Sequence, residues 1–303
     1  MSQSSFKRKK ISRVRFVAWG ATVCSLAFLS PELLGAEPTN TATRSSAKQP
    51  LIVAHRGASH DAPENTLAAF NLAWKQNADV IEGDFYLTAD DQIVCLHDKT
   101  TSRTAPNQPS YTPADATLEQ LRTLDVGAWK GAQFAGEKIP TLDEVLKTIP
   151  AGKKIFVEIK CGPEILPVLK EQLASSDLRP DQIVLICFNT EVVTQARKTM
   201  DQYQTNWLTS YRRDSKTQSL TPTTSTIVDT LRKTSASGLG TRDEMDAIDG
   251  EMVRAVHEMG CGIHAWTVDN PSVAKTLHQL GFDSITTNRP AEIRAAIGTT
   301  KTQ

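Results

Sequence analysis

Short apolar runs alternate with amphipathic stretches along most of the chain from residue 51 onward. The apolar runs are roughly four to eight residues long, which is typical of buried strands bounded by turns. They predict strands at 51–55, 79–86 with its continuation 93–97, 154–160, 183–188, 206–211, 236–240, 262–267 and 284–287.

Between these runs, apolar residues recur at helical spacing, as Leu67, Phe70 and Trp74 do. Strand-helix alternation indicates a parallel sheet, and eight such units over about 250 residues have the size of a (β/α)8 TIM barrel. A doubly wound sheet is the alternative, but no Gly-x-Gly-x-x-Gly follows a predicted strand. Further helices are predicted at 164–174, 190–201, 222–233, 249–259 and 271–280.

The segment from 98 to 140 is too long for an ordinary strand-to-helix loop, so it predicts a small insertion after the second strand. It contains Trp129 and Phe134, which we expect to cover the site. The barrel domain is expected to span 51–298.

Residues 1–36 hold six Lys and Arg followed by fifteen mostly apolar residues, "FVAWGATVCSLAFLS". This run is shorter than the roughly 20 residues that cross a bilayer. The pattern predicts a secretory signal peptide, with an uncleaved anchor as the alternative. Residues 37–50 are polar and predict a flexible leader. We therefore expect an exported protein, periplasmic or secreted, with no membrane span after cleavage.

Beyond residue 36 the chain has 28 Lys and Arg against 33 Asp and Glu. A mildly acidic body argues against nucleic acid as a partner. Four cysteines lie in or beside apolar runs without Cys-x-x-Cys spacing, so we expect reduced core residues rather than disulfides or a zinc site. These are Cys95, Cys161, Cys187 and Cys261.

Ionisable residues occur where several predicted strands end, and such ends meet at one face of a barrel. Glu82 and Asp84 are two positions apart, so on a strand they share a face with each other. Together with Glu158 they give three carboxylates, which cannot all be buried and ionised without a cation. Oxygen ligands favour a hard ion, Ca²⁺ or Mg²⁺.

Arg56 and Lys160 add positive charge beside these carboxylates, which suits a bound phosphate. His55 and His97 are then candidate proton donor and acceptor, because imidazole titrates near neutral pH. The residues thus indicate phosphodiester chemistry. Other polar residues at these ends are Asp98, which either orients His97 or opens the loop, and His264, Trp266 and Asp269.

Several polar residues have structural interpretations instead. Asn65 in "PENT" is expected to cap the helix that follows. His60, His257 and His278 are expected to be ordinary hydrogen-bonded residues.

Six segments in order resemble the glycerophosphodiester phosphodiesterases, a family of metal-dependent (β/α)8 barrels. They are "AHRGASHDAPENTLAAF", "EGDFYLTADDQIVCLHD", "IPTLDEVL", "FVEIK", "AWTVDN" and "ITTNRP".

The resemblance implies general acid-base roles for His55 and His97, and one divalent cation held by Glu82, Asp84 and Glu158. It also implies three substrate-binding residues: Arg56, Lys160 and Trp266. In the mechanism that it implies, the glycerol 2-hydroxyl attacks phosphorus and expels the alcohol, and the cyclic product is hydrolysed to glycerol 3-phosphate.

Two positions depart from the family pattern. Asn288 stands where Asp is common, and Asp269 lies between Val and Asn in "TVDN". Both put the substrate preference in question rather than the chemistry. Two other functions remain open: a related barrel phospholipase acting on intact lipids, and a silent barrel that only binds glycerophosphodiesters. The sequence does not specify the leaving alcohol.

Overall fold

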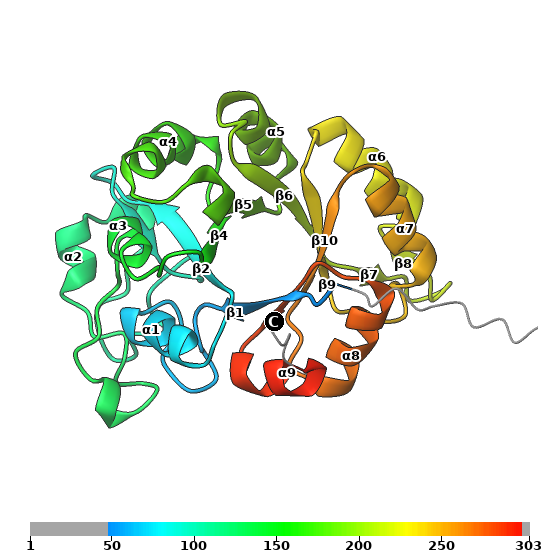
Figure 1. Ribbon diagram of the computed structural model, residues 1–303. Coiled ribbons are helices and arrows are strands. Elements are labelled where there is room, and N and C mark those ends of the chain that lie inside the picture. The colour runs from blue at the N-terminus through cyan, green and yellow to red at the C-terminus, as the bar shows by residue number, and fades with distance from the viewer. Residues whose placement is uncertain (1–47, 299–303) are drawn as a thin grey trace, which may run out of the picture. The chain divides into compact units, whose positions relative to one another are not determined.

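The structure, a computed structural model, describes residues 48–298. The predicted signal peptide and residues 37–47 of the predicted leader lie outside this range. Eight parallel strands form a closed wall, and the helices surround it (Figure 1). The predicted (β/α)8 barrel is therefore confirmed. The barrel strands are β1 (Leu51–His55), β2 (Val80–Leu87), β4 (Lys154–Ile159), β5 (Ile183–Cys187), β6 (Gln204–Thr209), β9 (Gly238–Arg242), β10 (Gly262–Trp266) and β11 (Ser284–Thr287).

The barrel closes because β1 pairs in parallel with both β11 and β2. Parallel strands are covered on both faces, so they read as nearly continuous apolar runs in the sequence. The covering helices begin with α1 (Leu67–Lys75) and continue with α4 (Leu166–Ser175), α5 (Thr190–Thr199), α6 (Thr224–Thr234), α7 (Gly250–Glu258), α8 (Pro271–Leu280) and α9 (Pro290–Ile297).

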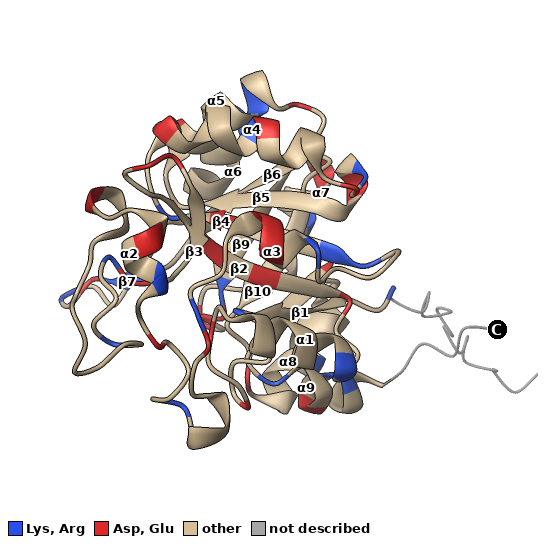
Figure 2. Ribbon diagram, turned by 90° about the vertical axis from the view of Figure 1, so that its left-hand side faces the viewer, with Lys and Arg blue, Asp and Glu red and all other residues tan. Residues whose placement is uncertain are grey.

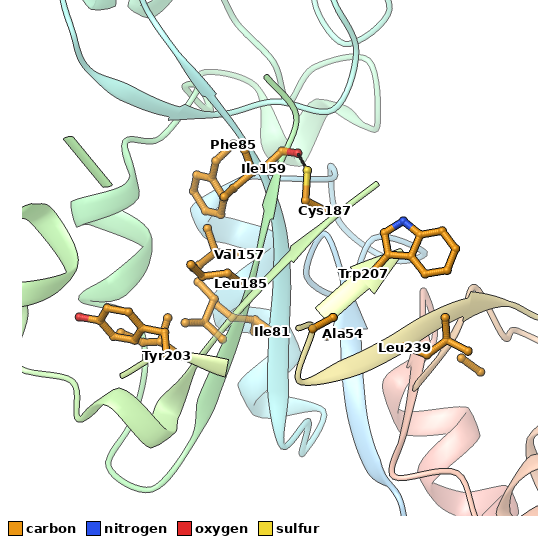
Figure 3. Close-up of a cluster of buried hydrophobic side chains, with 14 of the residues drawn as sticks. Ala54, Ile81, Phe85, Val157, Ile159, Leu185, Cys187, Tyr203, Trp207 and Leu239 are labelled. Carbon is orange, nitrogen blue, oxygen red and sulfur yellow. Dashed lines mark hydrogen bonds between the residues drawn. The ribbon is translucent and has the colours of Figure 1, made fainter. Parts of the chain in front are cut away.

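The main core lies between the strands and these helices. In Figure 3, side chains of neighbouring strands such as Ile81, Val157 and Leu185 lie beside one another. A smaller cluster fills the barrel interior, with Phe156, Ile186 and Leu208 among its members. Burial of this apolar surface holds the wall rigid, and the wall in turn fixes the positions of the strand ends.

The four cysteines among the described residues are free, as predicted. Three are buried, and the Cys187 thiol donates a hydrogen bond to the carbonyl oxygen of Ile159 (Figure 3). Cys161 is only half-buried, which differs from the expected core position. It lies just beyond the carboxyl end of β4, outside the barrel wall.

The predicted continuation of the second strand is a separate element. β3 (Ile93–Cys95) pairs antiparallel with β2, so it turns back and does not belong to the barrel. His97 therefore follows a hairpin strand and not a barrel strand. The type of residue could not reveal this, because both strands have the same apolar pattern.

The predicted insertion after the second strand, 98–140, contains η1 (Pro113–Asp115), α2 (Leu118–Arg122) and η2 (Ala132–Phe134), and α3 (Leu142–Leu146) follows it. It has a small core of its own, in which Val94 of β3 packs with Leu121, Leu124 and Ile139. The insertion and β3 thus form one packed unit beside the barrel.

Short elements complete the structure: η3 (Pro163–Ile165), η4 (Pro180–Gln182), and the hairpin of β7 (Arg212–Arg213) and β8 (Leu220–Thr221). In Figure 2, acidic and basic residues are interspersed over helices and loops, and neither sign gathers over one group of the described elements in this view. Among the described residues, no helix is long and apolar enough to cross a membrane.

Candidate active site

Three carboxylates converge at the wall formed by β2 and β4. The register places Asp84 directly beside Glu158, and Glu82 beside His55 of β1. One oxygen from each carboxylate lies within 4.8 Å of the others. Asp84 and Glu82 are 1% and 2% exposed, and Glu158 is 9% exposed. The expected clustering of Glu82, Asp84 and Glu158 is therefore found.

This cluster has the properties of a cation site. Glu82 Oε1 and Asp84 Oδ1 are buried oxygens without a hydrogen-bond partner in the structure. Burial and the neighbouring carboxylates raise the pKa of Glu82 well above its usual range, and burial with Asp84 raises that of Glu158 to about 7. Buried carboxylates of this kind are costly unless a cation neutralises them. The donor set, all oxygen, fits Ca²⁺ or Mg²⁺.

Arg56 adopts a left-handed conformation, with φ of 55°, just after β1. In that conformation its backbone N–H donates to Glu82 Oε2 at 2.9 Å, and its Nε lies 3.2 Å from Asp84 Oδ2. A left-handed non-glycine residue is uncommon, and such strain often occurs at functional sites. Here it aims both the main chain and the guanidinium at the carboxylates.

Lys160 extends from the end of β4. Its Nζ donates to Glu158 Oε1 at 2.8 Å and lies 3.4 Å from Asp84 Oδ1. Burial raises the pKa of Asp84, but the positive charges of Arg56 and Lys160 outweigh it and hold that pKa below its usual value. Two fixed cations therefore border the carboxylates, as the sequence indicates.

His55 is held from its Nδ1 side. Asn288 Oδ1 lies 2.7 Å from His55 Nδ1, and Asn288 Nδ2 donates to Asp269 Oδ2 at 2.6 Å. Because Asp269 fixes the amide, the group that faces the ring is its oxygen, so His55 Nδ1 carries the proton and Nε2 is free to accept one. Burial and the charge of Arg56 lower the pKa of His55 to about 4, which keeps the ring neutral at pH 7.

His97 is held by a carboxylate. Asp98 Oδ1 lies 2.7 Å from His97 Nδ1, so Asp98 orients the ring. Asp98 in turn accepts from Arg103, with Nε to Oδ2 at 2.6 Å. Side-chain hydrogen bonds from Arg103 are the main reason why the pKa of Asp98 falls to about 2. Of the two roles considered for Asp98, the structure supports orientation of His97.

A small inner cavity opens beside the carboxylates. Trp266 lines it with His55 and Glu158, and its ring meets Phe188 edge to face, with 5.4 Å between centroids. Trp266 therefore lies in the same cavity as His55 and Glu158. An outer groove begins on the other side of Glu158 and is lined by His97, Asp98, Lys99, Lys160 and Phe188.

One expectation from the sequence fails here. Trp129 and Phe134 line neither of these two spaces, and Trp129 instead stands 36% exposed with its Nε1 bonded to the Val126 carbonyl. The insertion contributes Asp98 and Lys99 to the groove rather than an aromatic cover, and His97 immediately precedes it. His264 lies in the inner cavity, which neither Arg56 nor Lys160 lines, and it is hydrogen-bonded to Ser284.

The role of Asn65 is also different from the one expected. Thr66 caps the helix, with its Oγ1 accepting from the Ala69 N–H, whereas Asn65 is buried. Asn65 Nδ2 donates to Asp84 Oδ2 at 2.8 Å, and φ is 58°. The expectation overlooked that two cap-competent residues stand side by side, so one was free to orient a carboxylate.

The chain matches the glycerophosphoryl diester phosphodiesterase family over residues 55–292. It is 32% identical to a glycerophosphodiester phosphodiesterase of Caldanaerobacter subterraneus, with 79% of this chain and 94% of that protein aligned. The chain therefore belongs to the glycerophosphoryl diester phosphodiesterase family. Membership makes it a phosphoric diester hydrolase.

Further relatives agree with this family assignment. A glycerophosphodiester phosphodiesterase of Bacillus subtilis is 29% identical, with 84% of this chain and 89% of that protein aligned. A solved structure, an Oleispira antarctica phosphodiesterase in complex with the product sn-glycerol-3-phosphate, has a TM-score of 0.71 at 28% identity. The match covers 83% of this chain and 98% of the Oleispira antarctica chain. Glycerophosphodiester phosphodiesterase activity is thus supported by both sequence and fold.

Proposed function

We propose that this phosphodiesterase hydrolyses glycerophosphodiesters to an alcohol and glycerol 3-phosphate, with one divalent cation, Ca²⁺ or Mg²⁺, and two histidines for proton transfer. The observation that carries the proposal is the group of three buried carboxylates, two of them with unpartnered oxygens, bordered by two fixed cations. The complex of the Oleispira antarctica phosphodiesterase with sn-glycerol-3-phosphate supports the choice of product.

Glu82, Asp84 and Glu158 would hold the cation. When bound, it supplies positive charge that stabilises the extra negative charge on a phosphoryl group during the reaction. Asn65 keeps one oxygen of Asp84 occupied, so that the other oxygen faces the site. This arrangement explains why Asn65 adopts a left-handed conformation at a buried position.

Arg56 and Lys160 would bind the phosphate oxygens. Arg56 is already fixed by Asp84 and by Glu64, whose Oε1 accepts from Arg56 Nη1 at 2.8 Å. A guanidinium held on two sides loses little conformational freedom when a phosphate binds. Trp266 would pack against the substrate within the inner cavity.

The two histidines have complementary roles in the proposed reaction. In the first step, His55 Nε2 takes the proton from the glycerol 2-hydroxyl as its oxygen bonds to phosphorus. The bond from phosphorus to the alcohol breaks, and the alcohol oxygen takes a proton from His97. In the second step, water opens the cyclic phosphate as His97 accepts a proton and His55 returns one. Asp98 stabilises the imidazolium of His97 whenever it forms.

Release of glycerol 3-phosphate from glycerophosphocholine tests this function. We expect EDTA to stop release, and either Ca²⁺ or Mg²⁺ to restore it. Release that continues at the same rate in EDTA would contradict the cation site. Absence of release with both ions would contradict the substrate class, and intact phospholipid would be the next substrate to test.

We also propose export through residues 1–36, on the basis of their basic start and short apolar run alone. N-terminal sequencing of the mature protein recovered from outside the cytosol tests this. An intact residue 1 in the cytosolic fraction would contradict it.

A further inference from the structure

Arg103, in the insertion after β3, makes more side-chain ion contacts than its exposed position would suggest. Its side chain is 44% exposed, yet its guanidinium bonds to two carboxylates. Nη1 and Nη2 donate to the two oxygens of Glu64, at 2.8 and 2.7 Å. Nε and Nη2 donate to the two oxygens of Asp98, at 2.6 and 3.2 Å.

Both carboxylates that bind the forked guanidinium of Arg103 also contact residues of the candidate active site. Asp98 Oδ1 accepts a hydrogen bond from His97 Nδ1, and Glu64 Oε1 accepts one from Arg56 Nη1. Burial raises the pKa of Glu64, but the hydrogen bonds and charges of Arg103 and Arg56 outweigh burial and lower it to about 2. Both carboxylates are therefore anionic at neutral pH, and an uninterrupted hydrogen-bonded chain runs from His97 to Arg56.

The main chain at His97 is fixed independently of this network. The Leu96 N–H donates to the Asp84 carbonyl at 2.9 Å, which ties the end of the hairpin to β2. What the main chain does not fix is the rotation of the imidazole about its side-chain bonds. That rotation depends on Asp98, and Asp98 is half-exposed, so it needs a partner of its own to stay in place.

We propose that Arg103 is a positioning residue for the reaction. It holds Asp98 in the orientation that fixes the His97 ring, and it takes its own position from Glu64. This inference rests on the proposed role of His97 in proton transfer. Arg103 contacts neither the phosphate-side cations nor the three metal-site carboxylates, and Arg56 keeps its own bonds to Glu64 and Asp84 without it, so the main effect of Arg103 on the reaction passes through Asp98.

The fork geometry makes arginine necessary. A planar guanidinium satisfies two carboxylates at once, whereas a lysine ammonium keeps the charge but cannot reproduce four directed hydrogen bonds. Exposed ion pairs contribute little to folding stability. Arg103→Lys and Arg103→Ala should therefore change the reaction more than they change the melting temperature.

We expect Arg103→Ala to lower kcat for glycerophosphocholine by about tenfold, because a misplaced proton-transfer group reacts slowly. KM should change by less than about threefold, since Glu64 still holds Arg56. Arg103→Lys should recover only part of the loss. Arg122→Ala is the matched control, because Arg122 belongs to the same insertion, is 37% exposed and pairs with Glu144 away from the site.

Two measurements separate positioning from a general structural effect. In the His97→Ala background, Arg103→Ala should cause no further loss of kcat, since the group that it positions is gone. With a glycerophospho-p-nitrophenol ester, whose leaving group needs no protonation, the loss in Arg103→Ala should shrink to less than about threefold.

Each outcome has a distinct meaning. Equal losses from Arg103→Ala in the presence and absence of His97 would overturn the inference, and so would an unchanged kcat in Arg103→Ala while His97→Ala is impaired. A wild-type rate in His97→Ala would overturn both this inference and the proposed role of His97. A parallel loss in Arg122→Ala would show a general effect of the insertion and would also overturn it.

Discussion

His55 ends a barrel strand, whereas His97 follows a hairpin strand outside the barrel. His55 is held by the neutral amide of Asn288, and His97 by the carboxylate of Asp98. The first environment is enclosed and favours the uncharged ring, whereas the second is half-exposed and contains a carboxylate. Two identical side chains therefore lie in different surroundings, which suits them to two different tasks.

The largest effect should come from removing either ring. We expect His55→Ala and His97→Ala each to lower kcat by about 100-fold or more, as for a lost acid-base group. The comparison predicts a further difference between them. With a p-nitrophenol leaving group, His97→Ala should regain much of its rate and His55→Ala should not. Equal recovery in both variants would show that the two roles are not separated in this way.

The small core of the insertion offers a way to disturb the surroundings of His97 without disturbing those of His55. Leu124 is 1% exposed in the small core that also holds Val94 of β3. Leu124→Ala should lower the free energy of unfolding by about 2–5 kcal/mol. It should also lower kcat, because β3 and the insertion, which hold His97 in place, pack less tightly. Leu231→Ala in α6 is the control, since Leu231 is equally buried but packs in the main core. Denaturant unfolding and initial rates check both; a similar loss of kcat in both variants would contradict the separation.

The carboxylates can be tested without catalysis. Burial and the neighbouring carboxylates raise the pKa of Glu82 well above its usual range, so without a cation the uncharged form is more favoured than in a free glutamate. Glu82→Gln should then melt close to the cation-free wild type. Added Ca²⁺ or Mg²⁺ should raise the melting temperature of the wild type but not that of the variant.

The same experiment has a pH dependence with a definite sign. Cation binding displaces the proton from Glu82, so affinity in the wild type should rise as pH rises. Arg103→Ala and Asp98→Ala should keep the full cation-induced shift, because they act on the His97 side only. A cation-induced shift in Glu82→Gln as large as in the wild type would exclude Glu82 as a ligand.

The smallest effect should come from exchanging the partner of His55. Its pKa of about 4 means that it is a free base above that pH, so the acid limb of kcat/KM due to His55 should lie near pH 4. Asn288→Asp places a carboxylate beside Nδ1, which raises the pKa of the ring and moves this limb to higher pH by about one unit or more. At pH 8 the rate should change by only a few-fold. An unmoved acid limb would show that another group governs it.

The sequence predicts much of this architecture because each prediction depends on a local pattern. Apolar runs locate the barrel strands, and spacing by two places Glu82 and Asp84 on one face. What the pattern does not contain is pairing direction, so the antiparallel course of β3 is missed. The network from Glu64 to Arg103 is missed for a related reason: the two residues are 39 positions apart, and only the folded insertion brings them together.

Asn65 and Asn288 show the limits within the site itself. Their motifs are visible in the sequence, but an amide has two hydrogen-bonding ends, and only the folded protein shows which partner each end meets. Asn65 turns to Asp84 while its neighbour Thr66 caps the helix. Asn288, first noted only as a departure from the family pattern, proves to be the partner of His55.

The antiparallel course of β3 has a consequence for how this enzyme can diversify. The residues that are proposed to bind the cation belong to the barrel wall, and any change in their spacing would shift neighbouring strands. The unit that carries His97 is attached beside that wall and has its own core. We therefore expect that grafting a different insertion onto the same barrel would alter which alcohol departs and would leave the carboxylates in place.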